Sequence, residues 1–107
     1  MYQLIFYVPA SHLEAVKAEL FAAGAGRFNA YDQCAWQTLG EGQFRPLAGS
    51  QPFIGETGRR ETVSEYKVEL VCEDSVIKSA VSALLRVHPY QQPAYAVHKI
   101  LTVDDLP

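Results

Sequence analysis

The sequence lacks long hydrophobic runs and blocks of basic residues. No apolar stretch approaches the roughly 20 residues that a membrane-spanning helix needs, so we expect no membrane partner. Nine Lys and Arg residues stand against twelve Asp and Glu residues, which gives a net charge of −3. Because cationic side chains supply most of the non-specific affinity for nucleic acid, we expect no nucleic-acid partner either.

Cysteine is scarce as well, with only Cys34 and Cys72 in the chain. Small secreted domains that depend on disulfides usually contain more cysteines. The first nine residues are apolar but contain no basic leader, so they are more typical of a strand than of a signal peptide. We therefore expect a cytoplasmic protein with two reduced thiols. The length of 107 residues indicates a single domain, residues 1–107.

The beginning of the chain predicts a strand followed by a helix. Residues 2–8 are apolar on both faces, which is typical of a central strand. Ser11 and Glu14 have the spacing of a capping box, and apolar residues at helical spacing follow them. We expect this helix to end near Gly24, because glycine tolerates the left-handed backbone of a helix stop.

The middle of the chain predicts a hairpin and a long loop. Residues 31–39 alternate between apolar and polar side chains, and the Gly40-Glu41-Gly42 sequence interrupts them, so we interpret residues 31–46 as a hairpin. Residues 46–63 contain two Pro and three Gly residues and show little periodicity. A loop of this length is uncommon in a compact domain and is usually functional, ordered by a partner, or mobile.

The last third of the chain predicts a strand, a helix and a strand. Residues 65–72 alternate cleanly, with apolar side chains at the even positions, which indicates a half-buried strand. Asp74 is placed to cap a helix with a broad apolar face, and Pro89 blocks its continuation. Residues 95–101 predict the last strand, and residues 104–107 a frayed tail.

Together these elements define an α+β fold of the order β-α-β-β-α-β, the split βαβ pattern of ferredoxin-like domains. Both helices then cover one face of one antiparallel sheet. The other face mixes apolar and charged residues, which are Gln3, Ile5, Tyr7, Glu65, Lys67 and Glu69. We expect further copies of the chain to cover this face, and the alternative is a solvated sheet face.

A resemblance to known proteins supports the same fold. Residues 87–95 read Val-His-Pro-Tyr-Gln-Gln-Pro-Ala-Tyr. This segment resembles the His-Pro-Tyr-Glu-x-Pro stretch of CutA-like proteins and of the PII-like domain inserted in bacterial YqfO proteins of the Nif-three-like family. Glycine, proline and acidic residues between positions 40 and 69 follow the order of that insert, as does the Gly-Ala-Gly sequence at 24–26. Gln91 and Ala96 depart from the pattern, where acidic residues are usual.

The resemblance implies a PII-like or CutA-like ferredoxin-like sandwich with an extra β-hairpin, assembled as a homotrimer through its sheets and hairpins. It also implies that the chain is the insert standing alone, without the metal-binding halves that flank it in YqfO proteins. Their metal chemistry is therefore not expected here.

His88, Tyr90 and Gln91 form the first group of candidate ligand-binding residues. A neutral His88 could ligate a metal ion or carry a proton near neutral pH. The alternative is structural, with Pro89 ending the helix and Tyr90 anchoring the turn by packing.

A dedicated metal site has little support, because the three His and two Cys residues lack the close spacing of metal ligands. His88 is only a weak candidate for a metal ligand. We expect Cys34 and Cys72 in the core, where free cysteines are common.

A second group of candidates lies in the long loop and the strand after it. Glu61 and Glu65 could bind cations or act as acids and bases, or they could form salt bridges with basic neighbours. Arg59 and Arg60 follow a Gly-Glu-Thr-Gly sequence that could fold as an anion-binding nest of backbone amides. We expect any pocket between subunits, lined by residues 46–63 and the turn at residues 88–93.

No catalytic constellation and no cofactor motif is present, since the sequence contains neither a Walker pattern nor a G-x-S-x-G motif. Together with the resemblance, this absence predicts a non-enzymatic, homo-oligomeric PII-like module that has a regulatory role or binds a small ligand, such as an anion. The alternative is a protein of CutA type that binds divalent metal ions or confers tolerance to them.

Overall fold

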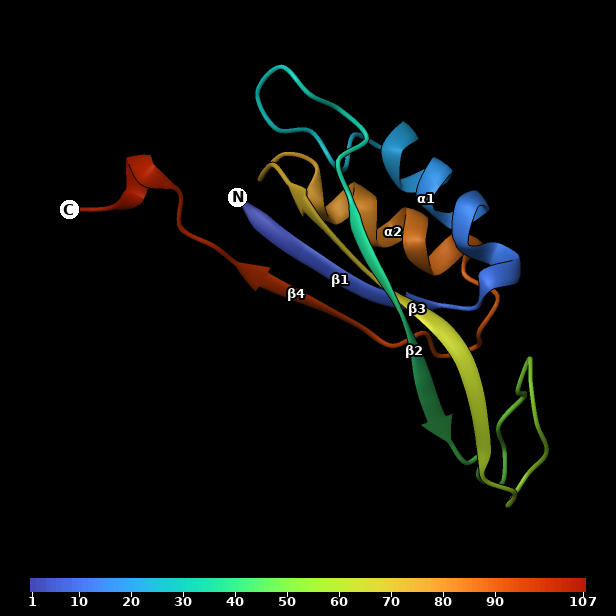
Figure 1. Ribbon diagram of the computed structural model, residues 1–107. Helices are drawn as coiled ribbons and strands as arrows, with labels where there is room; N and C mark the ends of the chain where they lie inside the picture. Colours follow the sequence, from blue (N-terminus) through green and yellow to red (C-terminus); the bar gives the residue numbers. More distant parts are fainter.

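The computed structural model describes residues 1–107 and contains four strands, two α-helices and two short 3-10 turns (Figure 1). In chain order these are β1 (Tyr2–Val8), η1 (Ala10–His12), α1 (Leu13–Ala22), β2 (Trp36–Phe44), β3 (Glu61–Cys72), α2 (Ile77–Val87), β4 (Tyr95–Lys99) and η2 (Val103–Asp105). The expected order β-α-β-β-α-β is confirmed. Neither α-helix has the length and apolar character needed to cross a bilayer.

All four strands form one antiparallel sheet in the order β2-β3-β1-β4. β1 pairs with β3 on one side, from Tyr2 opposite Cys72 to Val8 opposite Tyr66, and with β4 on the other. Two hydrogen-bonded neighbours make β1 an interior strand of the sheet. This placement confirms the expectation drawn from its two apolar faces.

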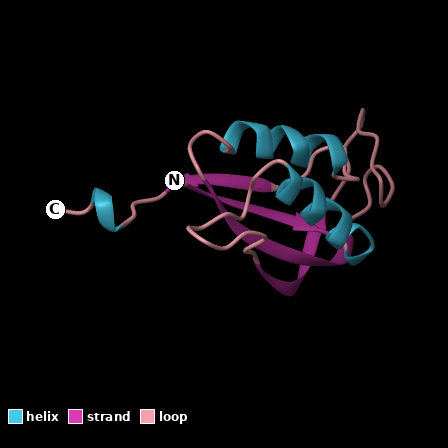
Figure 2. Ribbon diagram, turned by 90° about the horizontal axis from the view of Figure 1, so that it is seen from above, coloured by secondary structure: helices cyan, strands magenta, loops and turns pink.

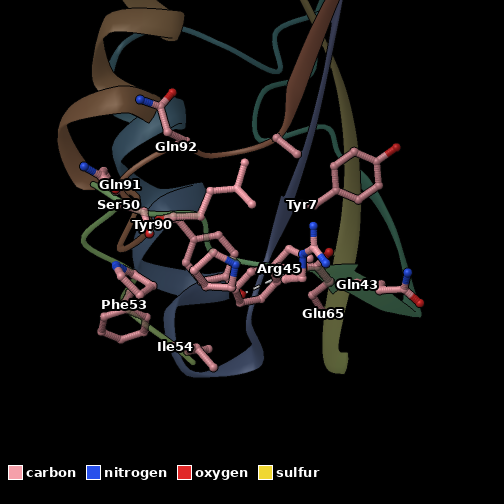
Figure 3. A pocket seen from close by; sticks show the side chains of 15 residues that line it. Tyr7, Gln43, Arg45, Ser50, Phe53, Ile54, Glu65, Tyr90, Gln91 and Gln92 are labelled. Carbon is pink, nitrogen blue, oxygen red and sulfur yellow. Dashed lines mark hydrogen bonds between the residues drawn. The ribbon is translucent and has the colours of Figure 1, made fainter. Parts of the chain in front are cut away.

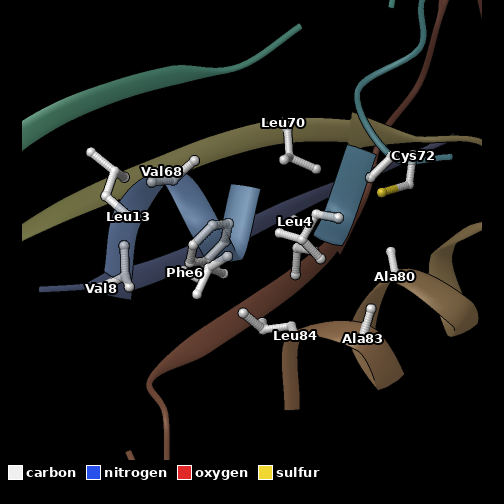
Figure 4. Close-up of a cluster of buried hydrophobic side chains, with 13 residues drawn as sticks. Leu4, Phe6, Val8, Leu13, Val68, Leu70, Cys72, Ala80, Ala83 and Leu84 are labelled. Carbon is white, nitrogen blue, oxygen red and sulfur yellow. The ribbon is translucent and has the colours of Figure 1, made fainter. Parts of the chain in front are cut away.

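Both helices pack on the same face of the sheet (Figure 2), so the other face carries no helix. The core lies between these two layers (Figure 4), and it contains the even-numbered side chains from Leu4 to Val8 of β1 and from Val68 to Cys72 of β3, together with the apolar stripes of α1 and α2. Cys72 is fully buried in this core as expected. Cys34 is only half-buried, because it lies in the irregular segment before β2 instead of in a strand.

The expected helix caps are wrong at both helices. α1 begins after His12 without a side-chain cap, and the Ser11 hydroxyl bonds to Nδ1 of His12 instead. Asp74 pairs with the amino terminus of the chain and does not cap α2. The stop of α1 near Gly24 is confirmed, since this residue has a φ of +99°.

The hairpin expected within residues 31–46 is also wrong. Gly40 and Gly42 lie inside the single strand β2, which pairs along its whole length with β3, from Trp36 opposite Glu69 to Phe44 opposite Glu61. Neither glycine has a positive φ, so neither makes a turn. The hydrogen-bonded partner strand overrides the low strand propensity of glycine. The hairpin is therefore β2–β3, and residues 45–60 connect its arms.

The chain ends in a segment that extends away from the sheet (Figures 1 and 2). This segment is not frayed throughout, because Thr102 and Asp105 form a capping box around the 3-10 turn η2. Its apolar side chains Leu101 and Val103 are exposed.

Candidate functional site

A cavity of about 410 Å³ lies where the loop at 45–60 folds against the turn after α2 (Figure 3). The loop contributes residues from Arg45 to Ile54, and the turn contributes residues 90–92 and Ala94. Tyr7 of β1 and Glu65 of β3 line its inner side. The structure thus brings the long loop and the turn together within one chain.

Three aromatic side chains from separate segments form one wall of the cavity. The ring of Tyr90 lies 6.5 Å from that of Phe44 at the end of β2 and 6.1 Å from that of Phe53 in the loop. His12 supports Phe53 from outside in an edge-on contact at 5.6 Å. Such aromatic contacts contribute beyond the area that they bury. They hold the loop against the body of the domain.

Glu65 is the acidic group of the cavity. Its Oε2 atom accepts a hydrogen bond of 3.4 Å from the Tyr90 hydroxyl. A side chain on Gly42 would overlap the Glu65 carboxylate, so this glycine leaves the space in which the carboxylate lies. Burial raises the pKa of Glu65, and burial together with the Glu65 charge raises the pKa of Tyr90 to about 12.

His88 lies behind the cavity and supports its aromatic wall. Its Nε2 atom donates a 2.6 Å hydrogen bond to the carbonyl oxygen of Tyr7, and the backbone N–H of Tyr90 donates to its Nδ1 atom over 3.1 Å. These partners require a neutral ring with the proton on Nε2. Burial lowers the pKa of His88, in agreement with a neutral ring. With both nitrogens occupied, His88 offers no lone pair to a metal ion.

Gln91 connects the turn to the loop. Its Oε1 atom accepts a hydrogen bond of 2.8 Å from the backbone N–H of Gln51. An amide oxygen accepts this bond as a carboxylate would, so the departure from the acidic residue of the resembling families keeps the contact.

Arg59, Arg60 and Glu61 lie outside the lining of the cavity. Arg59 has a side chain that is 72% exposed, and its Nε atom lies 3.8 Å from Oε1 of Glu61, which favours the salt-bridge interpretation. The backbone N–H groups of Gly58 and Arg59 donate to the carbonyl oxygens of Pro46 and Glu56. These two amides are therefore not free to form the expected anion nest.

Phe53 belongs to residues 46–63, which the sequence predicted as part of the pocket lining, and it is the only aromatic residue between positions 45 and 60. Sequence reasoning missed Tyr7, Phe44 and Arg45 as residues of the cavity. Phe44 and Arg45 lie in the range that the sequence predicted as a hairpin, residues 31–46, and so were not considered as pocket residues.

A second hollow lies on the helix-free face of the sheet, where Gly40 and Gly42 lack side chains. It has a volume of about 360 Å³ and shares Tyr7, Glu65 and Ala94 with the first cavity. Glu65 therefore contacts both spaces. No group of three or more His, Cys, Asp or Glu residues is placed to hold a metal ion.

Comparison with solved structures defines the class of fold. CutA from Archaeoglobus fulgidus, described as a periplasmic divalent cation tolerance protein, superimposes with a TM-score of 0.66 at 14% identity over 94% of this chain and 84% of its own. The PII-like protein CutA from Nostoc sp. PCC 7120 superimposes with a TM-score of 0.67 at 12% identity, over 94% and 81%. The chain therefore has a PII-like, CutA-like ferredoxin-like fold, as expected.

The sequence relatives are longer proteins. A Bacillus cereus protein related to NIF3 matches with a TM-score of 0.78 and 31% identity, over 91% of this chain and 24% of its own. The GTP cyclohydrolase 1 type 2 homolog of Bacillus subtilis is 42% identical over 98 residues, and that of Mycobacterium leprae is 38% identical over 97 residues.

These matches cover 92% and 91% of this chain, which spans only about a quarter of the length of either relative. No family model matches the sequence. The expected resemblance to the PII-like segment of Nif-three-like proteins is confirmed.

Proposed function

We propose that the chain is a self-associating PII-like module that binds a small molecule in the cavity between the loop at 45–60 and the turn after α2. The observation that carries this proposal is the cavity itself, with its aromatic wall and the single, half-buried carboxylate of Glu65. Its volume of about 410 Å³ falls within the range of roughly 300–1,000 Å³ that is usual for ligand pockets.

We infer a regulatory role and not a catalytic one. Two groups that could perform chemistry are held in unreactive forms, since burial raises the pKa of the Cys72 thiol to about 11 and both ring nitrogens of His88 are engaged. The name of the curated relatives refers to GTP cyclohydrolase 1 type 2. Because this chain corresponds to about a quarter of their length, the proposal concerns this domain alone.

Self-association is part of the proposal because of the helix-free sheet face. Trp36, paired with Glu69 on this face, is 60% exposed in the single chain. Glycines 40 and 42 leave the adjoining hollow that a neighbouring subunit could fill. The resemblance to CutA-like proteins favours a homotrimer. The two free cysteines suit a reducing compartment, so we place the protein in the cytoplasm.

A second candidate function is the binding of divalent metal ions, supported by the fold shared with a protein described as a cation tolerance protein. Elemental analysis of untagged protein separates the two candidates. Stoichiometric metal would favour the second candidate, and protein that takes up no metal in titration would remove it.

Native mass spectrometry tests the leading proposal, because it reads the number of subunits and any retained small molecule together. We expect a trimer whose mass includes a ligand or that takes up small molecules from a fragment mixture. A monomer at micromolar concentration would contradict the assembly. A failure of every fragment to perturb Phe53 or Tyr90 in amide spectra would contradict the ligand site.

A further inference from the structure

The cavity carries one group of each charge on an otherwise largely apolar lining. Glu65 and Arg45 both line it, and no salt bridge connects them. Two of the neutral polar groups are already engaged, since the Ser50 hydroxyl donates to the carbonyl oxygen of Leu47 and the Gln91 amide oxygen accepts from the backbone N–H of Gln51. Because Glu65 and Arg45 do not pair with each other, they are suited to a ligand that carries one positive and one negative group.

Glu65 offers the position for a cationic group. Its Oε2 atom has one donor, the Tyr90 hydroxyl, and no protein hydrogen bond reaches Oε1. A carboxylate accepts several hydrogen bonds, so an ammonium group has free acceptor positions here. Burial raises the pKa of Glu65, and a bound cation would stabilise the charged form of this carboxylate.

Arg45 offers the position for an anionic group. It directly follows β2, so the paired strand holds its backbone at the rim of the cavity. The planar guanidinium group binds carboxylates with two parallel hydrogen bonds. Arg45 is exposed in the single chain and forms no salt bridge, so a ligand carboxylate does not compete with a protein carboxylate for its guanidinium group.

The aromatic wall determines what the ligand carries between these charges. The rings of Phe44 and Phe53 lie 6.5 and 6.1 Å from the ring of Tyr90 and are tilted against it by 44° and 42°. Such a wall favours a flat or bulky apolar group over a polar one.

We propose that the cavity binds a free α-amino acid with a large apolar side chain, with the ammonium group at Glu65, the carboxylate at Arg45 and the side chain on the aromatic wall. This inference rests on the proposed ligand-binding function and names the chemical class of its ligand. A phosphate-rich or purely anionic ligand fits less well, because Glu65 repels it and Arg45 is the only cationic residue of the lining.

Isothermal titration calorimetry on the full chain tests this inference with four probes. L-phenylalanine carries all three features, phenethylamine lacks the carboxylate, 3-phenylpropionate lacks the ammonium group, and L-alanine lacks the large side chain. We expect phenylalanine to bind at least tenfold more tightly than each of the other three. Equal affinity for phenethylamine or 3-phenylpropionate overturns the assignment of a zwitterion.

Variants assign each charge to its residue. Glu65→Gln should remove the preference for phenylalanine over 3-phenylpropionate, which lacks the ammonium group. Arg45→Gln should remove the preference for phenylalanine over phenethylamine, which lacks the carboxylate. Arg59→Gln is the matched control, because Arg59 lies outside the cavity, and it should bind phenylalanine as the unmodified chain does. Circular dichroism checks that each variant is folded, and unchanged preferences in folded variants contradict the assignment.

The two proposals fail in distinguishable ways. Absence of phenylalanine binding overturns the amino-acid assignment. The ligand-binding function is overturned only if none of the probes and no fragment shifts the amide resonances of Phe53 and Tyr90.

Discussion

At the scale of single residues, Gly42 decides where the carboxylate of Glu65 lies. The two residues are on adjacent strands, and the carboxylate occupies the space that a side chain at position 42 would fill. From this place it accepts the hydrogen bond of Tyr90. The position of the acidic group in the cavity therefore depends on Gly42, a residue without a side chain.

Substitution of Gly42 by Ala should displace this carboxylate toward solvent. Because Gly42 has no positive φ and the obstructing atoms belong to a flexible side chain, we expect a stability change of only about 1 kcal/mol or less. The pKa of Glu65 should fall toward its ordinary value as burial is relieved, which a carbon-13 NMR titration measures. Gly40→Ala is the control, because only a backbone atom lies near its side-chain position, at 4.0 Å. An unchanged Glu65 pKa in Gly42→Ala contradicts this account.

His88 makes folding sensitive to acid. Burial keeps the pKa of His88 in the folded chain below its ordinary value of 6.5. As the pH falls, the unfolded chain therefore binds a proton at this residue before the folded chain does. The resulting stability is present above pH 6.5 and is lost as the pH falls through the folded pKa. Glu65 acts in the opposite direction, since its raised pKa adds relative stability as the pH falls through its folded value.

We expect the unfolding free energy to decrease below pH 6.5, with a slope of at most about 1.4 kcal/mol per pH unit from this proton. Urea denaturation at pH 7.5 and 5.5 measures the change. His88→Gln should be less stable overall but should show a smaller change, because the contribution of Glu65 is common to both proteins. His98→Gln, at an exposed position of β4, should respond to pH as the unmodified chain does. Equal changes in all three proteins would exclude His88 as the cause.

At the scale of elements, the β2–β3 hairpin carries the loop to the site. β1 ends opposite Tyr66, so residues 61–65 of β3 pair only with β2. The loop at 45–60 begins at the end of this two-stranded ribbon and folds back onto the turn after α2 (Figure 1). Phe53 and the bond between Gln51 and Gln91 are its contacts with that turn.

Phe53→Ala should release the loop while the core remains folded. Loss of the ring contacts with Tyr90 and His12 should remove about 1–2 kcal/mol of local stability, because Phe53 belongs to no core cluster. Hydrogen exchange of the Gly58 amide, which donates to Pro46, should become roughly 5–30 times faster. Leu39→Ala, at an exposed position of β2, is the control and should leave this rate unchanged. Unaltered exchange in Phe53→Ala would mean that other contacts hold the loop.

At the scale of the whole molecule, the sheet is covered on one face and open on the other (Figure 2). The core packs on one face against β1 and β3, and Trp36 is exposed on the other face. An open face of mixed polarity is stable in water but offers a contact area to further copies.

Trp36 is the only tryptophan of the chain and reports on this face. If copies assemble through the open face, the indole is desolvated, and its fluorescence emission should lie at shorter wavelength than in a monomer. Dilution that dissociates the assembly, followed by light scattering, should move the emission to longer wavelength. Emission that stays constant through dissociation would place the contact on another surface.

The periodicity of the sequence was sufficient to predict β1, β3 and the order of the elements along the chain. The core-facing side of an element is visible in its own sequence, as alternation in residues 66–72 and as helical spacing of apolar residues in the two helices. The same reasoning failed at Gly40 and Gly42, because strand formation there depends on pairing with β3 and not on local propensity. The helix caps at Ser11 and Asp74 failed for a related reason, since each side chain found another partner.

The sequence by itself therefore determined the fold class, the buried stripes and the two segments that meet at the site. Only the tertiary structure decided which residues of those segments face the cavity. Arg45 and Glu65 are 20 positions apart, and the pairing of β2 with β3 brings their segments together. His88 contacts Tyr7 from the far end of the chain, and that contact engages its ring. Such contacts depend on the packing of elements that are distant in the sequence, and no local sequence pattern indicates them.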